Sequence, residues 1–573
     1  MKKSLVVLLL CGASAACVQT APTIEHGAAR VFIADAGFMC GERCTTASQL
    51  CGAMFDLAVC SSGCEETRAT CIDVAGFDCF ELRKCARAAP TRPFDTGTAG
   101  TNVKDLAGDF TLATTHGTWT FAEEWTGDDS YVFLLFAPST SGVFSQSLTQ
   151  LLSASPRNVH YFFGWVSDLA SFETRRAEWE RALQLLPAAD RAHWQTHVHF
   201  ITQRFDGLTA WPGQMIARRM ANPPTYIGNG LTAFAIDRFQ RIREVGMLGR
   251  LGSSGLISEL EMLANEPKAF EFEFARATRL SAQQATVVTI ASSQIVHDTL
   301  ETDVTLPDPS GFDTLEVDLT IDCPDHMNAK CGAWDYLSHL RLCDAPGMCT
   351  RELARWITPY WREGHWVTDI SAQLAVLPTG TARLQWWASG QWDPRTTDYT
   401  VSLSLRYSNS GRGMKPVSAT PLWTGGDWNA TYDSMKLPVN VLIPADAKKV
   451  ELVTLVTGHG GVQPTNCAEF CNHEHHYLVN GVEHVQSFPG AQTASGCADR
   501  VGQGIVPNQH GTWYYGRGGW CPGEDVAPWV VDVTADVTKG QMNTLSYSTR
   551  FNGAPVNAGL GNIVLSSWLV VWK

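Results

Sequence analysis

The sequence contains few charged side chains, and positive charge is in deficit. Charged residues make up 17% of the 573 residues, and 43 Lys and Arg stand against 57 Asp and Glu, for a net charge of -14. Non-specific nucleic-acid binding needs basic surface that displaces counterions from phosphates. The composition therefore argues against a nucleic-acid partner. The hydrophobic content of 45% also argues against a disordered chain.

Long hydrophobic runs are missing beyond the N-terminus, so we expect no transmembrane helix in the mature chain. Two lysines precede an apolar run over residues 5–10, and small residues follow up to Cys17. This pattern is typical of a signal peptide over residues 1–17. Residues 14–17 resemble a lipobox with Cys17 as the lipidated residue; cleavage without a lipid is the alternative. We therefore expect an exported protein, either an outer-membrane lipoprotein attached through Cys17 or a secreted or periplasmic protein.

Cysteine is absent from residues 105–265 and abundant before them. Eight of the 18 cysteines lie in residues 36–86, where the spacing C-x3-C-x6-C starts at Cys40 and again at Cys60. On a helix such positions form one stripe. After the signal-peptide cysteine and Cys17 are set aside, 16 remain, and export predicts that they form eight disulfides. Zinc sites use closer cysteine pairs, so a disulfide-bonded helical module over 36–86 is favoured, with its connectivity open.

The residue pattern changes twice in the middle of the chain. Residues 87–104 are rich in Pro, Thr and Gly and predict a linker. Residues 105–265 alternate apolar runs with amphipathic helical segments, which is typical of a parallel or mixed α/β sheet. They resemble a thioredoxin-like domain, but residues 138–142, where that family carries its redox cysteine pair, contain no thiol. Thiol–disulfide exchange needs a thiolate, so we expect a redox-inactive accessory domain.

From about residue 284 the pattern changes to short strands separated by Gly, Pro and Asn. Leu315, Val317, Leu319 and Ile321, for example, alternate with polar residues. This texture predicts an all-β region of about 290 residues, consistent with two sandwiches. Fourteen of the 20 tryptophans lie at or after Trp334. They fit either a sugar-binding cleft or a large β core, and composition alone favours the core.

Four short motifs occur in order through this β region. They are Cys-Gly-Ala-Trp-Asp-Tyr at 331–336, Ile-Thr-Pro-Tyr-Trp at 357–361, Cys-Ala-Glu-Phe-Cys at 467–471 and Gly-Trp-Cys-Pro-Gly at 519–523. In this order and spacing they resemble the peptide N-glycosidase F family, over about residues 286–573.

The resemblance implies an architecture and an activity. It implies two adjacent eight-stranded jelly rolls, over 286–410 and 411–573, with a cleft between them. It also implies an amidase that hydrolyses the β-aspartylglucosaminyl bond of N-glycoproteins or glycopeptides, so that Asn becomes Asp and the glycan is released. No metal or organic cofactor is implied.

The resemblance also implies roles for side chains. Amide hydrolysis needs an activated water, a donor to the developing oxyanion and a proton for the leaving nitrogen. Asp335 matches the catalytic carboxylate, Glu469 a carboxylate that binds the core sugar or positions water, and Arg517 a charge-assisted donor. The implied substrate-binding residues are Trp334, Tyr360, Trp361, Trp392, His459 and Trp520. The cysteines expected in disulfides are Cys323, Cys331, Cys343, Cys349, Cys467, Cys471, Cys497 and Cys521.

Departures from the family pattern keep a second hypothesis open. Where the family has a second Glu, this sequence has Gly390, and where the family has an Arg after the catalytic Asp, it has Tyr336. Two family tryptophans are also replaced: the one before the Gly-His pair by Thr457, and the one after the loop Glu by Phe470. Lost carboxylates and donors commonly cost orders of magnitude in rate. The alternative is a catalytically impaired glycan-binding protein on the same scaffold.

A third hypothesis comes from the histidines around Cys471. His473 and His475 lie two residues apart, which places two imidazoles on one strand face at a spacing suited to chelating a metal. The two-jelly-roll architecture is shared with copper monooxygenases, so a copper-dependent monooxygenase-like protein is the third possibility. The simpler interpretation is a polar segment beside the cleft.

Overall fold

The computed structural model describes most of the chain after residue 88. The described ranges are 89–221, 232–248, 259–326, 330–388, 398–460 and 466–573, together with parts of 40–85. The chain divides into two compact units, Met1–Arg87 and Ala88–Lys573. No helix among the described residues is long and apolar enough to cross a membrane. The predicted signal peptide and Cys17 lie outside the described residues.

The first unit is built from short helices joined by disulfides. It contains α1 (Cys40–Cys51) and α2 (Leu57–Ser62). The disulfides are Cys44–Cys60, which joins these two helices, Cys51–Cys79 and Cys71–Cys85. Four more pairs occur in the second unit, so the described chain is disulfide-bonded as predicted. The side chains of Cys40 and Cys64 lie outside the described residues.

The first part of the second unit is an α/β region around one five-stranded sheet. Its strand order is β5-β4-β3-β6-β7, with bounds β3 (Ser130–Phe136), β4 (Val159–Trp165), β5 (Val198–Phe200), β6 (Ala233–Ile236) and β7 (Ile242–Arg243). The first three strands are parallel, and the last two are antiparallel to their neighbours. All seven residues of β3 are buried, as expected for a strand covered on both faces. The mixed sheet fits the α/β prediction, while the thioredoxin-like assignment stays a prediction.

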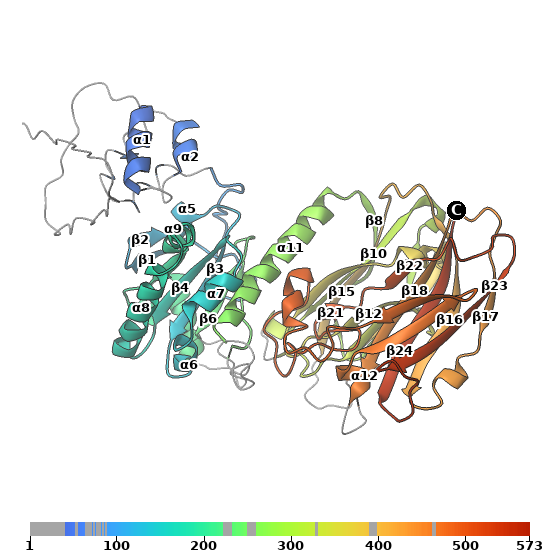
Figure 1. The fold of residues 1–573 in the computed structure, drawn as a ribbon. Helices are drawn as coiled ribbons and strands as arrows, with labels where there is room; N and C mark the ends of the chain where they lie inside the picture. The colour runs from blue at the N-terminus through green and yellow to red at the C-terminus, as the bar shows by residue number, and fades with distance from the viewer. Residues whose placement is uncertain are drawn as a thin grey trace, which may run out of the picture. The chain divides into compact units, whose positions relative to one another are not determined.

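Helices and a small hairpin cover this sheet (Figure 1). The hairpin is β1 (Thr111–Thr114) with β2 (Gly117–Thr120), and the helices are α5 (Phe121–Glu124), α6 (Ser141–Phe144), α7 (Leu148–Ala154), α8 (Leu169–Gln184), α9 (Ala188–His197), α10 (Trp211–Ala221) and α11 (Asn265–Ala282). Two aromatic-rich clusters fill the space on its two faces, one around Phe163 and Trp179 and the other around Phe133 and Phe162.

The rest of the unit consists of four antiparallel sheets in two pairs. The first pair is β13-β10-β15-β8 and β21-β12-β11-β14-β9, with β8 (Ala285–Val296), β9 (Thr299–Leu306), β10 (Thr314–Asp322), β11 (Leu337–Cys343), β12 (Arg351–Ile357), β13 (Gly364–Asp369), β14 (Gly380–Ala388), β15 (Tyr399–Ser408) and β21 (Glu524–Asp525). The second pair is β16-β24-β18-β22 and β17-β23-β19-β20, with β16 (Pro416–Trp428), β17 (Val439–Leu442), β18 (Lys449–His459), β19 (His473–Val479), β20 (Val482–Ser487), β22 (Trp529–Asp532), β23 (Met542–Phe551) and β24 (Gly561–Trp572).

Both pairs have the same strand topology. When β21 is left aside, the first, eighth, third and sixth strands of each half form one sheet, and the second, seventh, fourth and fifth form the other. Each half is therefore an eight-stranded antiparallel sandwich with the strand order of a jelly roll. Alternating strands such as β10 place Leu315, Val317, Leu319 and Ile321 in the core of the first sandwich, as the sequence pattern predicts.

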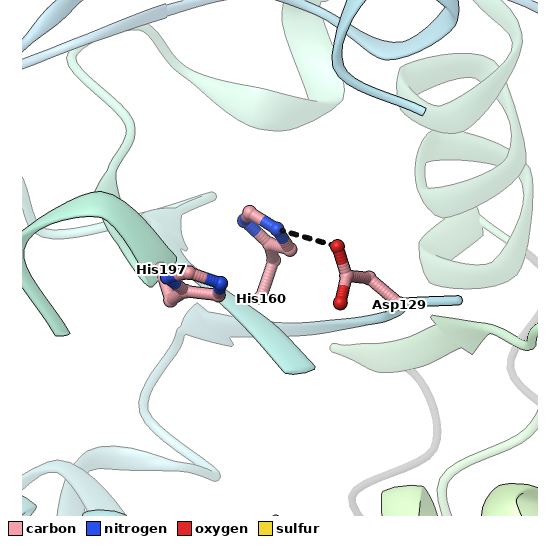
Figure 2. A group of neighbouring side chains, drawn as sticks. All are labelled: Asp129, His160 and His197. Carbon is pink, nitrogen blue, oxygen red and sulfur yellow. Dashed lines mark ion pairs between the residues drawn. The ribbon is translucent and has the colours of Figure 1, made fainter. Parts of the chain in front are cut away.

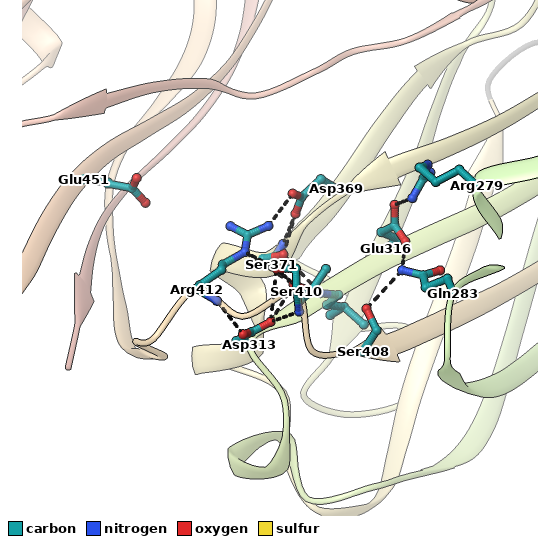
Figure 3. Close-up of polar contacts among 12 residues, drawn as sticks. Arg279, Gln283, Asp313, Glu316, Asp369, Ser371, Ser408, Ser410, Arg412 and Glu451 are labelled. Atoms are coloured by element: carbon teal, nitrogen blue, oxygen red, sulfur yellow. Dashed lines mark hydrogen bonds and ion pairs between the residues drawn. The ribbon is translucent and has the colours of Figure 1, made fainter. Parts of the chain in front are cut away.

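Two connections hold α11 and the inter-sandwich linker to the first sandwich (Figure 3). From α11, Arg279 pairs with Glu316 of β10 at 2.6 Å, and Gln283 donates to the same carboxylate at 2.8 Å. In the linker, the Arg412 backbone N–H donates to Asp313 and its guanidinium donates to Asp369 at 2.7 Å. These bonds fix the points where the chain enters and leaves the first sandwich.

The two sandwiches are joined by strand pairing and by an apolar cluster. β21 lies in the second half of the sequence but pairs with Trp356 and Ile357 of β12. A shared cluster includes Ile357 from the first sandwich and Val453, Trp520 and Trp568 from the second half. The long segment 488–523, which precedes β21, is thereby held against the first sandwich.

Candidate active site

Asp335 lies two residues before β11, in a half-buried position. The hydroxyl of Tyr360 donates a hydrogen bond of 2.6 Å to its Oδ2. Burial raises the pKa of Asp335 to about 7, against the lowering effects of Arg517 and of the Tyr360 hydrogen bond, and Glu469 raises it further. Asp335 is therefore a carboxyl group that gains and loses a proton near neutral pH, which suits general acid–base chemistry.

The backbone around Asp335 is fixed by Thr358. The Thr358 hydroxyl donates to the carbonyl of Trp334 at 3.0 Å, and it accepts the N–H of Tyr336 at 2.8 Å. The Cys323–Cys331 disulfide closes the preceding loop. The tyrosine that binds Asp335 is itself anchored, because the Tyr360 N–H donates to Gln509 Oε1 at 2.9 Å. Asp335 and its donor are therefore held from both sides.

Glu469 and Arg517 form the second part of the site. Glu469 lies in α12 (Cys467–Phe470), between the two cysteines of the Cys467–Cys471 disulfide. Its Oε1 lies 3.1 Å from Arg517 Nε, and its Oε2 accepts the N–H of Gly460 at 3.0 Å. Burial raises the pKa of Glu469 against the lowering effect of Arg517. The Glu469 side chain is 19% exposed, so it is accessible to a ligand.

Arg517 is fully buried, and its hydrogen bonds go to the protein. Nη1 donates to the carbonyl of Tyr515 at 2.9 Å and Nη2 to Thr512 Oγ1 at 3.0 Å. The guanidinium lies over the rings of Phe470 and Trp520, at 4.5 and 5.3 Å from their centroids. This arrangement favours a fixed positive charge near both carboxylates over a direct donor to substrate.

Trp520 and His459 form a stacked wall next to Arg517. Their ring centroids are 5.1 Å apart with an interplanar angle of 23°, and Trp520 Nε1 donates to the carbonyl of Gly458 at 2.6 Å. Position 458 requires glycine, because an added Cβ would lie 1.7 Å from the carbonyl oxygen of Ala468. Burial lowers the pKa of His459 to about 3, with Arg355 and His339 adding to the effect. His459 is therefore a neutral ring at physiological pH.

The fold brings Asp335, Tyr360, Glu469 and Arg517 into one electrostatic cluster, although they lie far apart in the sequence. Asp335 is affected by the charges of Arg517 and Glu469, and Tyr360 is affected by the charges of all three. The β12–β21 pairing explains this proximity, because it holds the segment that carries Arg517 against the sandwich that carries Asp335.

The structure describes two of the three other tryptophans that were predicted to bind substrate. Trp334 is 38% exposed and meets Tyr360 edge-on at 6.3 Å, so its ring is accessible beside the site. Trp361 has a left-handed backbone with φ of 57°, its ring lies 6.3 Å from that of His510, and its N–H donates to the Gly332 carbonyl at 2.9 Å. Trp392 lies outside the described residues, as does Gly390.

The predicted cysteines form four pairs in the β region. They are Cys323–Cys331, Cys343–Cys349, Cys467–Cys471 and Cys497–Cys521. The last pair lies within the segment that carries Arg517 and Trp520. The disulfides therefore flank the cluster without contributing a reactive thiol.

The His-x-His pair does not resemble a metal site. His473 and His475 are both fully buried. Their four ring nitrogens all have partners: His473 Nδ1 and His475 Nε2 bond each other at 2.8 Å, His473 Nε2 bonds the Ala468 carbonyl, and His475 Nδ1 bonds the Tyr547 hydroxyl. The pair stabilises the core of the second sandwich, which argues against the copper hypothesis.

Sequence reasoning did not identify several residues that support the site. Thr512 and Gln509 position Arg517 and Tyr360, and no sequence pattern marks an isolated Thr or Gln for this. A further buried carboxyl, Glu524, accepts the Cys521 N–H at 2.6 Å and pairs with Arg500 at 2.7 Å. Burial raises the pKa of Glu524 to about 7. Its position one residue after the Gly-Trp-Cys-Pro-Gly motif was the available signal.

Comparison with known proteins identifies the relatives of the β region. A model of the C-terminal part of peptide-N-glycosidase F matches residues 427–570. The peptide-N(4)-(N-acetyl-β-D-glucosaminyl)asparagine amidase F of Elizabethkingia miricola is 24% identical over 277 residues, which cover 45% of this chain and 73% of that protein. This chain is related to the peptide-N-glycosidase F family.

Solved structures from this family were also found. A crystal structure of peptide-N(4)-(N-acetyl-β-D-glucosaminyl)asparagine amidase is 20% identical and covers 51% of this chain and 96% of its own, with a TM-score of 0.42. PNGase F, a glycosylasparaginase from Flavobacterium meningosepticum, is 19% identical and covers 50% of this chain and 96% of its own, with a TM-score of 0.40.

The departures from the family pattern have definite places in the structure. Tyr336 is buried, and its backbone bonds to Thr358 in both directions. Thr457 accepts from Arg355 Nη1 at 2.8 Å and contacts His459 Nε2 at 3.0 Å. Phe470 packs under the Arg517 guanidinium. Each of these three residues therefore has a structural contact of its own.

Proposed function

We propose that this chain is an exported amidase that hydrolyses the β-aspartylglucosaminyl bond of N-glycoproteins or glycopeptides. The products would be a peptide with Asp in place of Asn and a released glycan. The relationship to peptide-N-glycosidase F supports the reaction class. The seven described disulfides support an oxidising compartment.

One observation carries the proposal: the pKa of Asp335 is raised to about 7 in a cluster with Tyr360, Arg517 and Glu469. A carboxylate with a pKa near the operating pH is a more effective general base than one with an ordinary Asp pKa. In its ionised form Asp335 would take a proton from the attacking water. The Tyr360 hydroxyl, which donates to Oδ2, would hold the other oxygen of Asp335 toward the water.

Glu469 and Arg517 have separate roles in this proposal. Glu469 remains accessible and would bind hydroxyl groups of the core sugar or orient the water. Arg517 acts through Glu469 and through its charge, because its hydrogen bonds are directed to protein atoms. Its nearby positive charge favours the ionised forms of both carboxylates. Trp334 is 38% exposed and supplies an aromatic face that suits a sugar ring. Trp520 is buried against His459 and Arg517, so it supports the site and does not contact the sugar.

Mass spectrometry of an Asn-linked glycopeptide and of a denatured N-glycoprotein tests this activity. The full chain should convert the glycosylated Asn to Asp, and in heavy-oxygen water the new carboxyl should carry the label. Asp335→Asn and Glu469→Gln should abolish or strongly reduce conversion. Asp344→Asn and Glu483→Gln, at exposed positions, are matched controls that should leave it unchanged.

Two outcomes would contradict the proposal. One is no conversion of either substrate by the folded chain, and the other is full conversion by Asp335→Asn. Absent conversion with retained glycopeptide binding would favour the glycan-binding alternative. The buried position of Tyr336 where the family has an Arg is the observation that favours that alternative.

A further inference from the structure

The α/β region places three histidines and one aspartate at one edge of its sheet. Because β3, β4 and β5 are parallel, their first residues lie at the same edge. Asp129 directly precedes β3, His160 is the second residue of β4, and His197 and His199 flank the start of β5. This edge is opposite to the ends of the strands, where residues 138–142 follow β3. The cluster is thus separate from the place where a redox cysteine pair is expected.

Three of these side chains converge on one point (Figure 2). One ligand atom from each of Asp129, His160 and His197 lies within 4.8 Å of the others. Asp129 Oδ2 and His160 Nε2 are 3.5 Å apart, which is long for a hydrogen bond between charged groups. Two ligands about 2.0–2.1 Å from a tetrahedral ion lie roughly 3.4 Å apart. The observed spacing therefore matches that of two ligands of one ion.

In His160 and in His197, the Nδ1 atom makes hydrogen bonds that orient the ring. His197 Nδ1 bonds the carbonyl of His193 and the hydroxyl of Thr196, both at 2.9 Å. His160 Nδ1 bonds His199 Nε2 at 3.0 Å. In protein metal sites a ligating histidine usually donates its second N–H to a carbonyl or a similar acceptor, which fixes the ring and its tautomer. His160 is thereby held with its Nε2 toward Asp129.

Two other groups of three possible metal ligands occur among the described residues, but their ligand atoms are already occupied. In one, Asp322 and Glu363 beside His326 already hold the ammonium of Lys104, which lies 2.8 Å from Glu363. In the other, Cys343 and Cys349 are joined in a disulfide, so no thiolate is available. The Asp129 carboxylate accepts from the Thr126 hydroxyl at 2.8 Å and lies 3.5 Å from His160 Nε2, and no Lys or Arg is paired with it among the described residues.

We propose that Asp129, His160 and His197 bind a divalent transition-metal ion, with zinc as the ion that this ligand set fits. Two imidazole nitrogens and one carboxylate oxygen are zinc ligands of the usual types, and three protein ligands leave a fourth position for water or an exogenous ligand. The metal would tie together the starts of three strands and the end of α9. This proposal does not rest on the proposed amidase function.

Metal titration of the full, disulfide-bonded chain tests the site. Zinc is titrated in competition with a chromophoric chelator, and cobalt is titrated while its visible absorption is followed. The chain should bind one ion tightly, and cobalt should give a tetrahedral spectrum without a thiolate band. Asp129→Asn and His197→Gln should each weaken zinc binding by at least about 10-fold. Zinc should also raise the melting temperature of the unsubstituted chain, and this increase should be lost in both variants.

Asp128→Asn is the matched control. Asp128 is the neighbouring carboxylate, but its side chain is 45% exposed and pairs with Arg238, so zinc affinity should not change. Circular dichroism of each variant without metal verifies the fold. Failure of the folded, unsubstituted chain to bind either ion in excess would overturn the proposal. Unchanged zinc affinity in Asp129→Asn and His197→Gln would also overturn it, because the bound zinc would then lie elsewhere.

Discussion

Two carboxylate–arginine clusters lie between the sandwiches, and they differ in how many donors each carboxylate has. Glu352 accepts from Arg355 Nε and Nη2, from Ser566 and from His339, at 2.5–2.8 Å. These charges and hydrogen bonds hold the pKa of Glu352 well below its usual range despite burial. Among the described residues, Asp335 accepts one side-chain hydrogen bond, from Tyr360, and burial raises its pKa to about 7.

The difference separates a structural carboxylate from a reactive one. Glu352 and Arg355 are both buried, and Arg355 also donates to Thr457 and to the Val564 carbonyl across the interface. A carboxylate with all its lone pairs used has little capacity to accept another proton. Asp335 is left under-solvated beside an accessible Glu469. The comparison therefore predicts that activity depends on Asp335 and that stability depends on Glu352.

The largest expected effect is on catalysis by Asp335. Asp335→Asn keeps the size of the side chain and removes the base, so we expect kcat/KM to fall by about 1,000-fold or more. The free energy of unfolding should not fall at pH 8, because the variant no longer buries a charge there. Glycopeptide kinetics and urea unfolding of the same samples measure the two quantities. Equal loss of activity and stability would show that Asp335 is structural like Glu352.

The corresponding change at Glu352 should act mainly on stability. Glu352→Gln removes the charge that balances buried Arg355, and breaking such a pair costs about 3–5 kcal/mol. The measurement is the free energy of unfolding from urea titration, with Glu483→Gln as the exposed control. A loss smaller than that of a surface pair would contradict the structural role assigned to Glu352.

pH should affect the two sites in opposite directions. The folded pKa of Asp335 is raised from 3.8 to about 7, so the folded state holds a proton that the unfolded state loses. Its contribution therefore lowers the free energy of unfolding as pH rises from about 4 to 7. The folded pKa of Glu352 is lowered from 4.5, so its contribution is present above that value and is lost as pH falls below it.

The free energy of unfolding of the unsubstituted chain, measured across this range, should include the fall between pH 4 and 7 that Asp335 causes. This fall should be smaller in Asp335→Asn. If Asp335 is the base, kcat/KM should also rise with pH through an apparent pKa near 7. An activity profile that is flat between pH 5 and 8 would contradict the role of Asp335 as the base.

The sequence predicts the β region better than it predicts the site. Alternating apolar residues such as Leu315 and Val317 have the two-residue period of a half-buried strand. This period is visible in the sequence because it involves only neighbouring residues. The collinear motifs also predict that Asp335 and Glu469 belong together. Their support does not follow from any local pattern: Arg355 reaches Thr457 across 102 residues, and Tyr360 reaches Gln509 across 149. Such contacts depend on how the two sandwiches pack, which periodicity does not encode.

The smallest expected effect is at Thr457, which links the two clusters. Its hydroxyl accepts from Arg355 and contacts His459, whose ring stacks on Trp520 next to Arg517. Thr457→Val keeps the shape but leaves one Arg355 donor with only its bond to Val564, so the free energy of unfolding should fall by about 1–3 kcal/mol. Thr457→Ser should restore it, because it retains the hydroxyl. Because His459 would lose a partner but stay stacked, kcat/KM should change far less than in Asp335→Asn. A loss of activity as large as that in Asp335→Asn would show that the two clusters act as one unit.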